Sequence, residues 1–228
     1  MAPPPFLAER VRGVVFDLDG TLIDSYRAIA ISLNHARAAF GLPALSEDDV
    51  RLHVGRGLES LVADLVGEER VDDGVRLFRE RYATAYADGT TALPGAGETL
   101  RGLRERGFRM AIASNKPARF CRLILEDLGW LGLFDSVQGP DLAGHTKPDP
   151  TMIRLCLDAM EISPREGLYV GDMVLDVESA SRAGLPVVLV SGGSSSPEAL
   201  RETGLTLLPR LETLLGLLPP IPLRTERC

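Results

Sequence analysis

Two aspartates one residue apart follow an apolar run near the start of the chain. They are Asp17 and Asp19 in VVFDLDGTLID, residues 14 to 24, and Gly20 and Thr21 come directly after them. Carboxylates at this range repel and raise each other's pKa, so they indicate a bound cation or a shared proton. The alternative is a simple turn after a strand, where aspartate and glycine are common.

Further polar side chains that could take part in catalysis or binding occur later in the chain, again beside short apolar runs. They are Ser114 and Asn115, Lys147 before a proline, and Asp172 with Asp176 four residues on. Of the 25 basic residues only two are lysines, Lys116 and Lys147, so a lysine here is unusual for this chain. We therefore expect Lys147 to have a role that an arginine does not fill, and we leave the role of Lys116 open.

These residue types together fit phosphoryl transfer. Mg²⁺ binds through one or two carboxylates, keeps several waters and takes further oxygen ligands from a phosphate. A lysine supplies a compact positive charge for the same phosphate, and a hydroxyl with nearby backbone N–H groups binds its other oxygens. The set predicts a Mg²⁺ site next to a phosphate site.

The elements that must position these residues are short strands of a parallel sheet. Apolar, β-branched runs at 11–16, 108–114, 168–172 and 186–190 alternate with helical patterns, and LTLL at 205–208 is a further expected strand. Such strands are typical of a sheet covered on both faces and joined by right-handed crossovers. The pattern predicts an α/β fold, a three-layer Rossmann-like parallel sheet, with the polar residues at the carboxyl ends of its strands, where ligands bind.

The interval between the first two strands is too long for one crossover and reads as purely helical. Apolar residues recur at helical spacing along three segments, from Ile29 to Phe40, from Leu58 to Leu65 and from Val75 to Tyr86. We expect an α-helical cap subdomain over residues 24–92, inserted into a catalytic core formed by residues 1–23 and 93–228. A cap of this kind would meet the leaving group of a substrate.

Four dispersed motifs in this order resemble the phosphatases of the haloacid dehalogenase superfamily. They are DLDGT, the strand-end Ser114, Lys147 before a proline, and GDMVLD at 171–176. The resemblance covers about residues 11 to 218 and is far more specific than the paired aspartates alone. Met173 departs from the pattern, because relatives often carry a small hydroxyl residue there.

The resemblance implies a role for each matched position. Asp17 would be the nucleophile that forms an aspartyl-phosphate, and Asp19 the acid that protonates the leaving oxygen and later activates water. Mg²⁺ would be held by Asp17, the backbone carbonyl of Asp19 and Asp172, while Asp176 would support the metal or orient Lys147. The phosphate would lie against these residues: Gly20, Thr21, Ser114, Asn115 and Lys147.

Within the superfamily, the residues argue against two other chemistries. Dehalogenases lack an acid at the position of Asp19, and phosphonate hydrolases need a lysine in the cap, where this chain has none. The cap stretch HVGRGLESL, residues 53–61, resembles a loop of phosphoglycolate phosphatases. There Arg56, between Gly55 and Gly57, would meet a substrate carboxylate, or it would be a solvated arginine in a turn.

We therefore expect a phosphoglycolate phosphatase-like hydrolase of a small phosphorylated metabolite. The alternatives are a pyrophosphatase, a sugar-phosphate phosphatase or mutase, and a non-catalytic regulatory protein that binds a phosphometabolite. A net charge of −7 and a sequence pI of about 5.1 argue against nucleic acid as a partner. Without a secretory signal or an apolar span we expect a cytoplasmic protein with no membrane contact, monomeric or homodimeric, whose three cysteines are free thiols.

Overall fold

The computed structural model describes residues 10–222, and its centre is a six-stranded sheet in which every neighbouring pair is parallel. The strand order is β5-β4-β1-β6-β7-β8. The strands are β1 (Gly13–Phe16), β4 (Arg109–Ala113), β5 (Ser136–Gln138), β6 (Gly167–Gly171), β7 (Val187–Val190) and β8 (Thr206–Leu208). The predicted α/β fold with a parallel sheet is confirmed. The edge strand β5 was not predicted, because three residues with one apolar side chain give no periodic signal.

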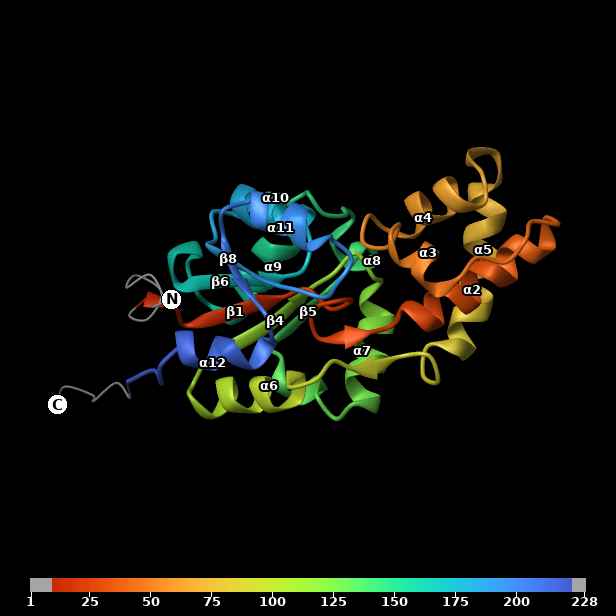
Figure 1. The fold of residues 1–228 in the computed structure, drawn as a ribbon. Helices are drawn as coiled ribbons and strands as arrows, with labels where there is room; N and C mark the ends of the chain where they lie inside the picture. The colour runs from red at the N-terminus through yellow and green to blue at the C-terminus, as the bar shows by residue number, and fades with distance from the viewer. Residues whose placement is uncertain (1–9, 223–228) are drawn as a thin grey trace.

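Helices cover both faces of this sheet and complete the three layers (Figure 1). One face packs on α6 (Ala96–Glu105), α7 (Ala118–Asp127) and α12 (Leu214–Leu217), and the other on α9 (Thr151–Met160), α10 (Val174–Ala183) and α11 (Pro197–Glu202). Side chains alternate along β1, so Val14 and Phe16 enter the first core while Val15 enters the second. The short helices α8 (Pro140–Ala143), η2 (Leu131–Leu133), η3 (Pro164–Glu166) and η4 (Leu211–Thr213) lie in the connections.

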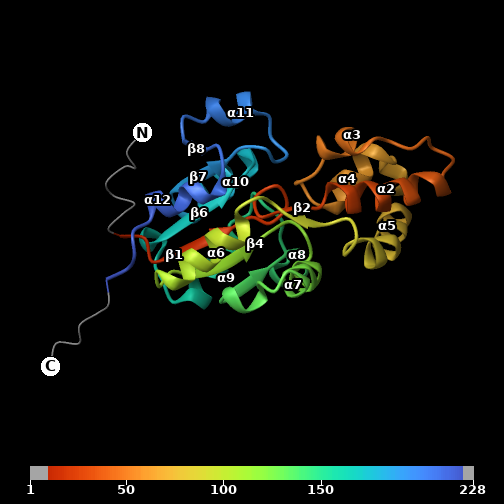
Figure 2. The same cartoon turned by 60° about the horizontal axis from the view of Figure 1, so that its bottom comes forward.

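A separate group of helices lies beyond one end of the sheet, as Figures 1 and 2 both show. It consists of α2 (Tyr26–Ala39), α3 (Glu47–Arg51), α4 (Leu58–Leu65), η1 (Glu68–Arg70) and α5 (Val71–Ala85) and has its own apolar core. The antiparallel strands β2 (Ile23–Asp24) and β3 (Thr91–Ala92) pair where the chain leaves the sheet and returns to it. We call this group of helices the cap. Helix α3 was not predicted, although Ser46 and Asp49 form a capping box at its start.

Parallel pairing aligns the strand ends that carry the polar residues. Phe16 of β1 pairs with Ile112 of β4 and with Val170 of β6. The residues that follow these strands therefore emerge at the same edge, which is the edge that faces the cap (Figure 2).

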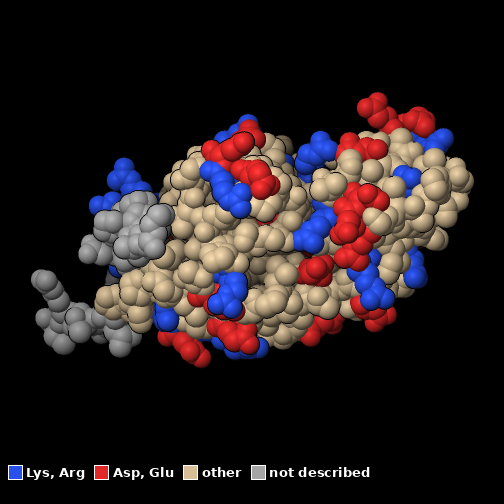
Figure 3. Space-filling model, in the orientation of Figure 1, with Lys and Arg blue, Asp and Glu red and all other residues tan. Residues whose placement is uncertain are grey.

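The surface and the cysteines have a simple description. On the face shown in Figure 3, acidic and basic side chains are interspersed, and no continuous basic surface is visible there. Within residues 10–222 no helix combines the length and the apolar character that crossing a membrane requires. Cys121 and Cys156 are buried free thiols, and Cys228 lies outside the described residues.

Candidate active site

Three buried carboxylates converge at the edge of the sheet that faces the cap. Asp17 directly follows β1, Asp172 directly follows β6, and Asp176 lies in the first turn of α10. One oxygen from each of the three lies within 4.8 Å of the others. The sequence places these residues up to 159 positions apart, so it is the parallel pairing of β1 with β6 that brings them together.

Asp17 is a buried carboxylate whose ionised form is disfavoured by its surroundings. Its side chain is almost completely buried, and its Oδ1 lies 2.9 Å from Nζ of Lys147. Burial raises the pKa of Asp17 to about 6, although the charge of Lys147 acts in the opposite direction. Among the described residues no donor approaches this Oδ1 with hydrogen-bond geometry. Oδ1 is therefore ion-paired with Lys147 but has no well-aligned hydrogen-bond donor among the described residues.

Asp172 is held by donors from two different loops. Thr21 donates its hydroxyl to Oδ1 at 2.8 Å, and the backbone N–H of Ser194 donates to Oδ2 at 2.7 Å. Gly20 stands beside the same carboxylate, where an added Cβ would lie 2.6 Å from Oδ2. Burial, followed by the charge of Asp17, raises the pKa of Asp172 well above its usual value.

Asp176 accepts more hydrogen bonds than Asp172, because two donors reach each of its oxygens. Oδ1 accepts from Nζ of Lys147 at 2.7 Å and from the hydroxyl of Tyr169 at 3.2 Å. Oδ2 accepts from the backbone N–H groups of Asp172 and Met173 at 3.1 and 3.0 Å. This arrangement occupies Asp176 with positioning Lys147 and the loop, and it leaves Asp17 and Asp172 as the better metal ligands.

The donor set fits a hard divalent cation. Two carboxylates with raised pKa values and an unsatisfied oxygen gain most from a nearby positive charge. All of the ligand atoms are oxygens, which Mg²⁺ prefers, and the two carboxylates leave room for water and a phosphate oxygen in its coordination shell. On these grounds the residues present fit Mg²⁺.

Asp19 is not one of the three clustered carboxylates, and it pairs with Lys116. Its Oδ2 lies 2.8 Å from Nζ of Lys116, and its Oδ1 accepts a hydrogen bond from the hydroxyl of Ser25. Lys116 is buried, lies 5.1 Å from the ring centroid of Tyr82, and has a pKa raised chiefly by Asp19 against the effect of burial. The role of Lys116, which the sequence left open, includes this contact with Asp19.

Ser114 and Asn115 follow β4 at the same edge. The Ser114 hydroxyl oxygen accepts from the N–H of Lys116 at 3.2 Å, and the side chain is buried beside the carboxylates. Asn115 accepts the backbone N–H of Lys147 at 2.7 Å and donates to the carbonyl of Gly55 in the cap at 2.8 Å. Asn115 thus joins the backbone at Lys147 to the cap loop at Gly55, a link that its place in the sequence did not indicate.

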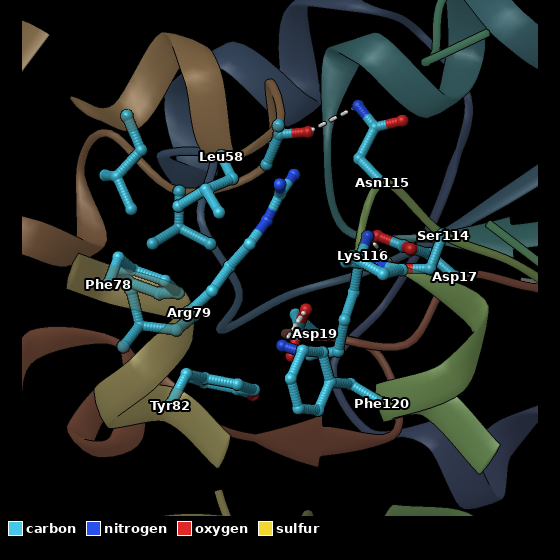
Figure 4. A pocket seen from close by; sticks show the side chains of 16 residues that line it. Asp17, Asp19, Leu58, Phe78, Arg79, Tyr82, Ser114, Asn115, Lys116 and Phe120 are labelled. Carbon is cyan, nitrogen blue, oxygen red and sulfur yellow. Dashed lines mark hydrogen bonds and ion pairs between the residues drawn. The ribbon is translucent and has the colours of Figure 1, made fainter. Parts of the chain in front are cut away.

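A cavity lies between this edge of the sheet and the cap. Figure 4 shows Lys116 reaching into it from the core and Arg79 reaching into it from α5. Apolar side chains form most of its remaining wall. The lining residues are Asp17, Asp19, Ile29, Val54, Gly55, Gly57, Leu58, Leu61, Phe78, Arg79, Tyr82, Ser114, Asn115, Lys116, Pro117 and Phe120.

The cap loop at residues 53–57 meets this cavity through its glycines. Gly55 and Gly57 line the cavity, with φ angles of +117° and +101° that favour glycine. Arg56 between them is exposed and pairs with Asp64, which His53 also contacts, so Arg56 is not among the lining residues. Arg79, from α5, is the cap arginine among the lining residues.

Met173, the departure from the family pattern, contacts the cap. An added Cβ on Gly55 would lie 2.1 Å from Sδ of Met173, so the thioether lies directly against this glycine. The contact is specific to a long side chain at position 173, because a small hydroxyl residue would not reach the cap.

Sequence reasoning missed several residues that this site uses. Tyr169 is hidden in the middle of an apolar strand, and Arg79 is one of many cap arginines. Ser194 had a usable signal, because SGGSSS at 191–196 follows a strand of the same sheet and its glycines permit close approach to a ligand or carboxylate.

Solved structures and curated sequences resemble this chain over most of its length. The structure of a predicted phosphatase from Clostridium acetobutylicum superposes with a TM-score of 0.82 at 25% identity, covering 90% of this chain and 97% of that one. A predicted phosphoglycolate phosphatase from Haemophilus somnus gives 0.80 at 26% identity, covering 91% and 98%.

Among curated proteins, phosphoglycolate phosphatase 1 of Pseudomonas aeruginosa is 34% identical, across 96% of this chain and 83% of the relative. Phosphoglycolate phosphatase of Rhodospirillum rubrum is 37% identical, across 81% of each. The family model described as haloacid dehalogenase-like hydrolase matches residues 14–190, a range that includes Asp17, Asp19, Ser114, Lys147, Asp172 and Asp176. With its carboxylates, lysine and helical insert in the corresponding order, the chain belongs to the haloacid dehalogenase-like hydrolases.

Proposed function

We propose that this chain is a Mg²⁺-dependent phosphatase of small phosphorylated metabolites, with phosphoglycolate as the leading substrate. The observation that carries the proposal is the placement of Asp17. Its buried carboxylate lies 2.9 Å from the ammonium of Lys147 through Oδ1, and Asp17 lines a cavity that Asp19 also lines. A nucleophile, a phosphate-binding cation and an acid thus share one space.

The proposed reaction has two steps at the same carboxylate. In the first, an Asp17 oxygen attacks phosphorus, the P–O bond to the leaving group breaks, and Asp19 gives its proton to the leaving oxygen. In the second, Asp19 takes a proton from water, the water oxygen bonds to phosphorus, and the bond to Asp17 breaks to release phosphate. Lys147 balances the charge on the phosphoryl oxygens and is held in place by Asp176.

The metal would be held by the carboxylates of Asp17 and Asp172 and by the backbone carbonyl of Asp19. When bound, Mg²⁺ would neutralise negative charge on the phosphoryl oxygens and on these carboxylates. Thr21 and the Ser194 N–H keep the Asp172 carboxylate turned toward this position. We propose Ser114 and the backbone around Gly20 as the remaining phosphate contacts.

The cavity supports a leaving group that carries a carboxylate. Lys116 and Arg79 are the two cations among its lining residues, one from each side (Figure 4). A carboxylate between them would compete with Glu59 for Arg79 and with Asp19 for Lys116, and would leave Asp19 free to face the leaving oxygen. Phosphoglycolate has such a group, and the names of the curated relatives support the same choice. We propose residues 24–92 as the cap that encloses this leaving group.

The apolar wall favours a second candidate substrate. Leu58, Leu61, Phe78 and Phe120 offer surface that the two carbons of glycolate cannot cover. A phosphoester with a larger, apolar leaving group that ends in a carboxylate would bury this surface. Sugar phosphates fit less well, because their hydroxyls would face side chains that cannot hydrogen-bond.

The test is release of phosphate from phosphoglycolate, pyrophosphate, a set of sugar phosphates and carboxylated phosphoesters of increasing length. Each substrate is run with Mg²⁺, with a chelator, and with the Asp17→Asn protein. Preference for a carboxylated substrate, abolished by the substitution and by chelation, would support both the reaction and the cavity assignment. Binding of these compounds without any phosphate release would instead favour the non-catalytic regulatory alternative.

A further inference from the structure

The metal-site carboxylate Asp172 depends on a glycine-rich loop that follows β7. The N–H of Ser194 in this loop donates to Asp172 Oδ2 at 2.7 Å. The loop approaches so closely that an added Cβ on Gly193 would lie 1.9 Å from the same oxygen. The orientation of the peptide group between Gly193 and Ser194 therefore decides whether Asp172 keeps this donor.

The other end of that peptide group is bound by the cap. Arg51, the last residue of α3, donates from Nε to the carbonyl of Gly193 at 3.3 Å and from its second guanidinium nitrogen to the carbonyl of Gly192. The Gly193 carbonyl and the Ser194 N–H belong to one planar peptide unit, so fixing the carbonyl also fixes the N–H. A chain of two hydrogen bonds thus joins a cap arginine to Asp172.

Tyr26 contacts both Arg51 and Ser194, the two ends of this chain of hydrogen bonds outside Asp172. The guanidinium of Arg51 lies 4.3 Å from the centroid of the Tyr26 ring, and the Tyr26 hydroxyl lies 2.9 Å from Oγ of Ser194. Tyr26 is buried and stands at the start of α2, where the cap begins. Its ring and hydroxyl therefore place Arg51 and Ser194 relative to each other.

The loop needs such anchoring, because its own backbone is permissive. Gly192 has a φ of +100° and Gly193 has no side chain, so the peptide beyond them rotates at little steric cost. A charged donor makes a stronger hydrogen bond to a carbonyl than a neutral one, which suits Arg51 to hold this peptide. Without Arg51, the N–H of Ser194 would be free to turn away from Asp172.

We propose that Arg51 is a positioning residue that couples the seating of the cap on the core to the orientation of Asp172. The proposal rests on the metal role assigned to Asp172 above. When the cap is seated, Arg51 orients the loop and the carboxylate is ready for Mg²⁺; when the cap moves away, Asp172 loses a donor and its affinity for the metal falls. By thermodynamic linkage, Mg²⁺ binding favours the seated cap in return.

The experiment compares Arg51→Ala with Arg76→Ala, a matched loss of a cap arginine whose ion pairs are confined to its own helix. The first readout is amide hydrogen exchange of the segment 191–196 in protein freed of metal. We expect the backbone amide of Ser194 to exchange at least several-fold faster in the Arg51→Ala protein than in the unsubstituted protein. In the Arg76→Ala protein its exchange rate should be unchanged.

The second readout is the Mg²⁺ concentration that gives half of the thermal shift, measured without substrate. Loss of a partner that orients a metal ligand costs about ten- to hundredfold in affinity, and Arg51 stands one contact further out, so we expect a rise of about threefold to tenfold. The Arg51→Lys protein keeps a charged donor group, so its Mg²⁺ concentration at half of the thermal shift should lie between those of the unsubstituted protein and the Arg51→Ala protein. Unchanged thermal midpoints of the metal-free variants would separate this effect from loss of folding.

The outcomes distinguish this inference from the proposed function. Equal exchange at Ser194 in both alanine variants would overturn the coupling, as would faster exchange with unaltered Mg²⁺ affinity. If the unsubstituted protein bound no Mg²⁺, the proposed metal-dependent function and the metal-linked part of the coupling would both fail. A further outcome is that the unsubstituted protein binds Mg²⁺ and releases phosphate while the Arg51→Ala protein keeps the same Ser194 exchange rate and the same Mg²⁺ affinity. That result would leave the proposed function standing and overturn only this inference.

Discussion

The ammonium of Lys147 lies 2.7 Å from the carboxylate of Asp176, and both side chains are buried. The same ammonium lies 2.9 Å from Asp17, so Asp176 holds Lys147 beside the proposed nucleophile. Removing one partner of a buried ion pair usually costs more than the pair itself contributes, because it leaves an uncompensated charge. The pair therefore gives a direct test of how the site is positioned.

We expect Asp176→Asn to lower kcat by about ten- to hundredfold, because Lys147 loses its stronger anchor while Asp17 keeps its charge. Steady-state kinetics with saturating Mg²⁺ measures the effect. Glu178→Gln on the same helix is the matched control, since Glu178 is exposed and pairs only with Arg182 among the described residues. Equal kcat values for the two variants would contradict the role given to Asp176.

Asp17→Asn is expected to abolish turnover and, in metal-free protein at pH 7.5, to stabilise the fold. Burial raises the pKa of Asp17 to about 6, so its ionised form is disfavoured in the folded state. A neutral amide removes this cost, and Lys147 keeps its ion pair with Asp176, so we expect the free energy of unfolding to rise by about 1 to 3 kcal/mol. Chemical denaturation with a chelator present measures it. A lower stability than that of the unsubstituted protein would show that Asp17 is not a destabilising charge.

The stability of metal-free protein should fall as pH rises from about 4 to above 6. Asp17 has a folded pKa of about 6, above its ordinary value of 3.8, and burial also raises the pKa of Asp172. The folded state therefore binds more protons than the unfolded state in this window, so raising the pH removes stability until both carboxylates are ionised. Exposed carboxylates with lowered pKa values, such as Asp49 and Asp149, act oppositely but at more acidic pH.

Mg²⁺ should reverse this trend, because it offsets the charge that burial penalises. We expect its thermal shift to be larger at pH 8 than at pH 5, measured by calorimetry at one fixed ionic strength. A shift of equal size at both values would mean that the ion binds elsewhere.

Substitution of Arg79 by methionine should impair hydrolysis of phosphoglycolate while sparing an uncharged phosphoester. A hydrogen bond between charged groups contributes about 1.5 to 3 kcal/mol, so kcat/KM should fall by about ten- to hundredfold for the carboxylated substrate alone. Arg56→Met is the matched control, since Arg56 pairs with Asp64 outside the cavity lining. A larger loss for Arg56→Met than for Arg79→Met would support the substrate contact predicted for Arg56 from the loop sequence.

The fold and the reactive groups were largely predictable from sequence, and the contacts among them were not. Local patterns are enough to indicate five of the six sheet strands, because buried parallel strands are apolar along their length. The strand β5 was not predicted because it is short and lies at an edge of the sheet. Helix α3 escaped because five residues give no periodicity, although it carries Arg51.

Asp17 and Asp172 illustrate what the sequence by itself determined. Each stands directly after an apolar run, and parallel strands must end at a common edge, so their proximity follows from topology alone. The nature of the site, a cluster of oxygen ligands beside a lysine, follows from residue types in the same way.

Only the tertiary structure decided which side chains serve that site from a distance. Arg56 turns to Asp64 while Arg79 enters the cavity, and Arg51 reaches a loop 141 positions away. Nothing in the local sequence separates these three arginines, because a flexible cationic side chain takes whichever acceptor the packed fold brings within reach. Sequence thus determined the chemistry at the strand ends, and the packing of cap on core decided how that chemistry is positioned.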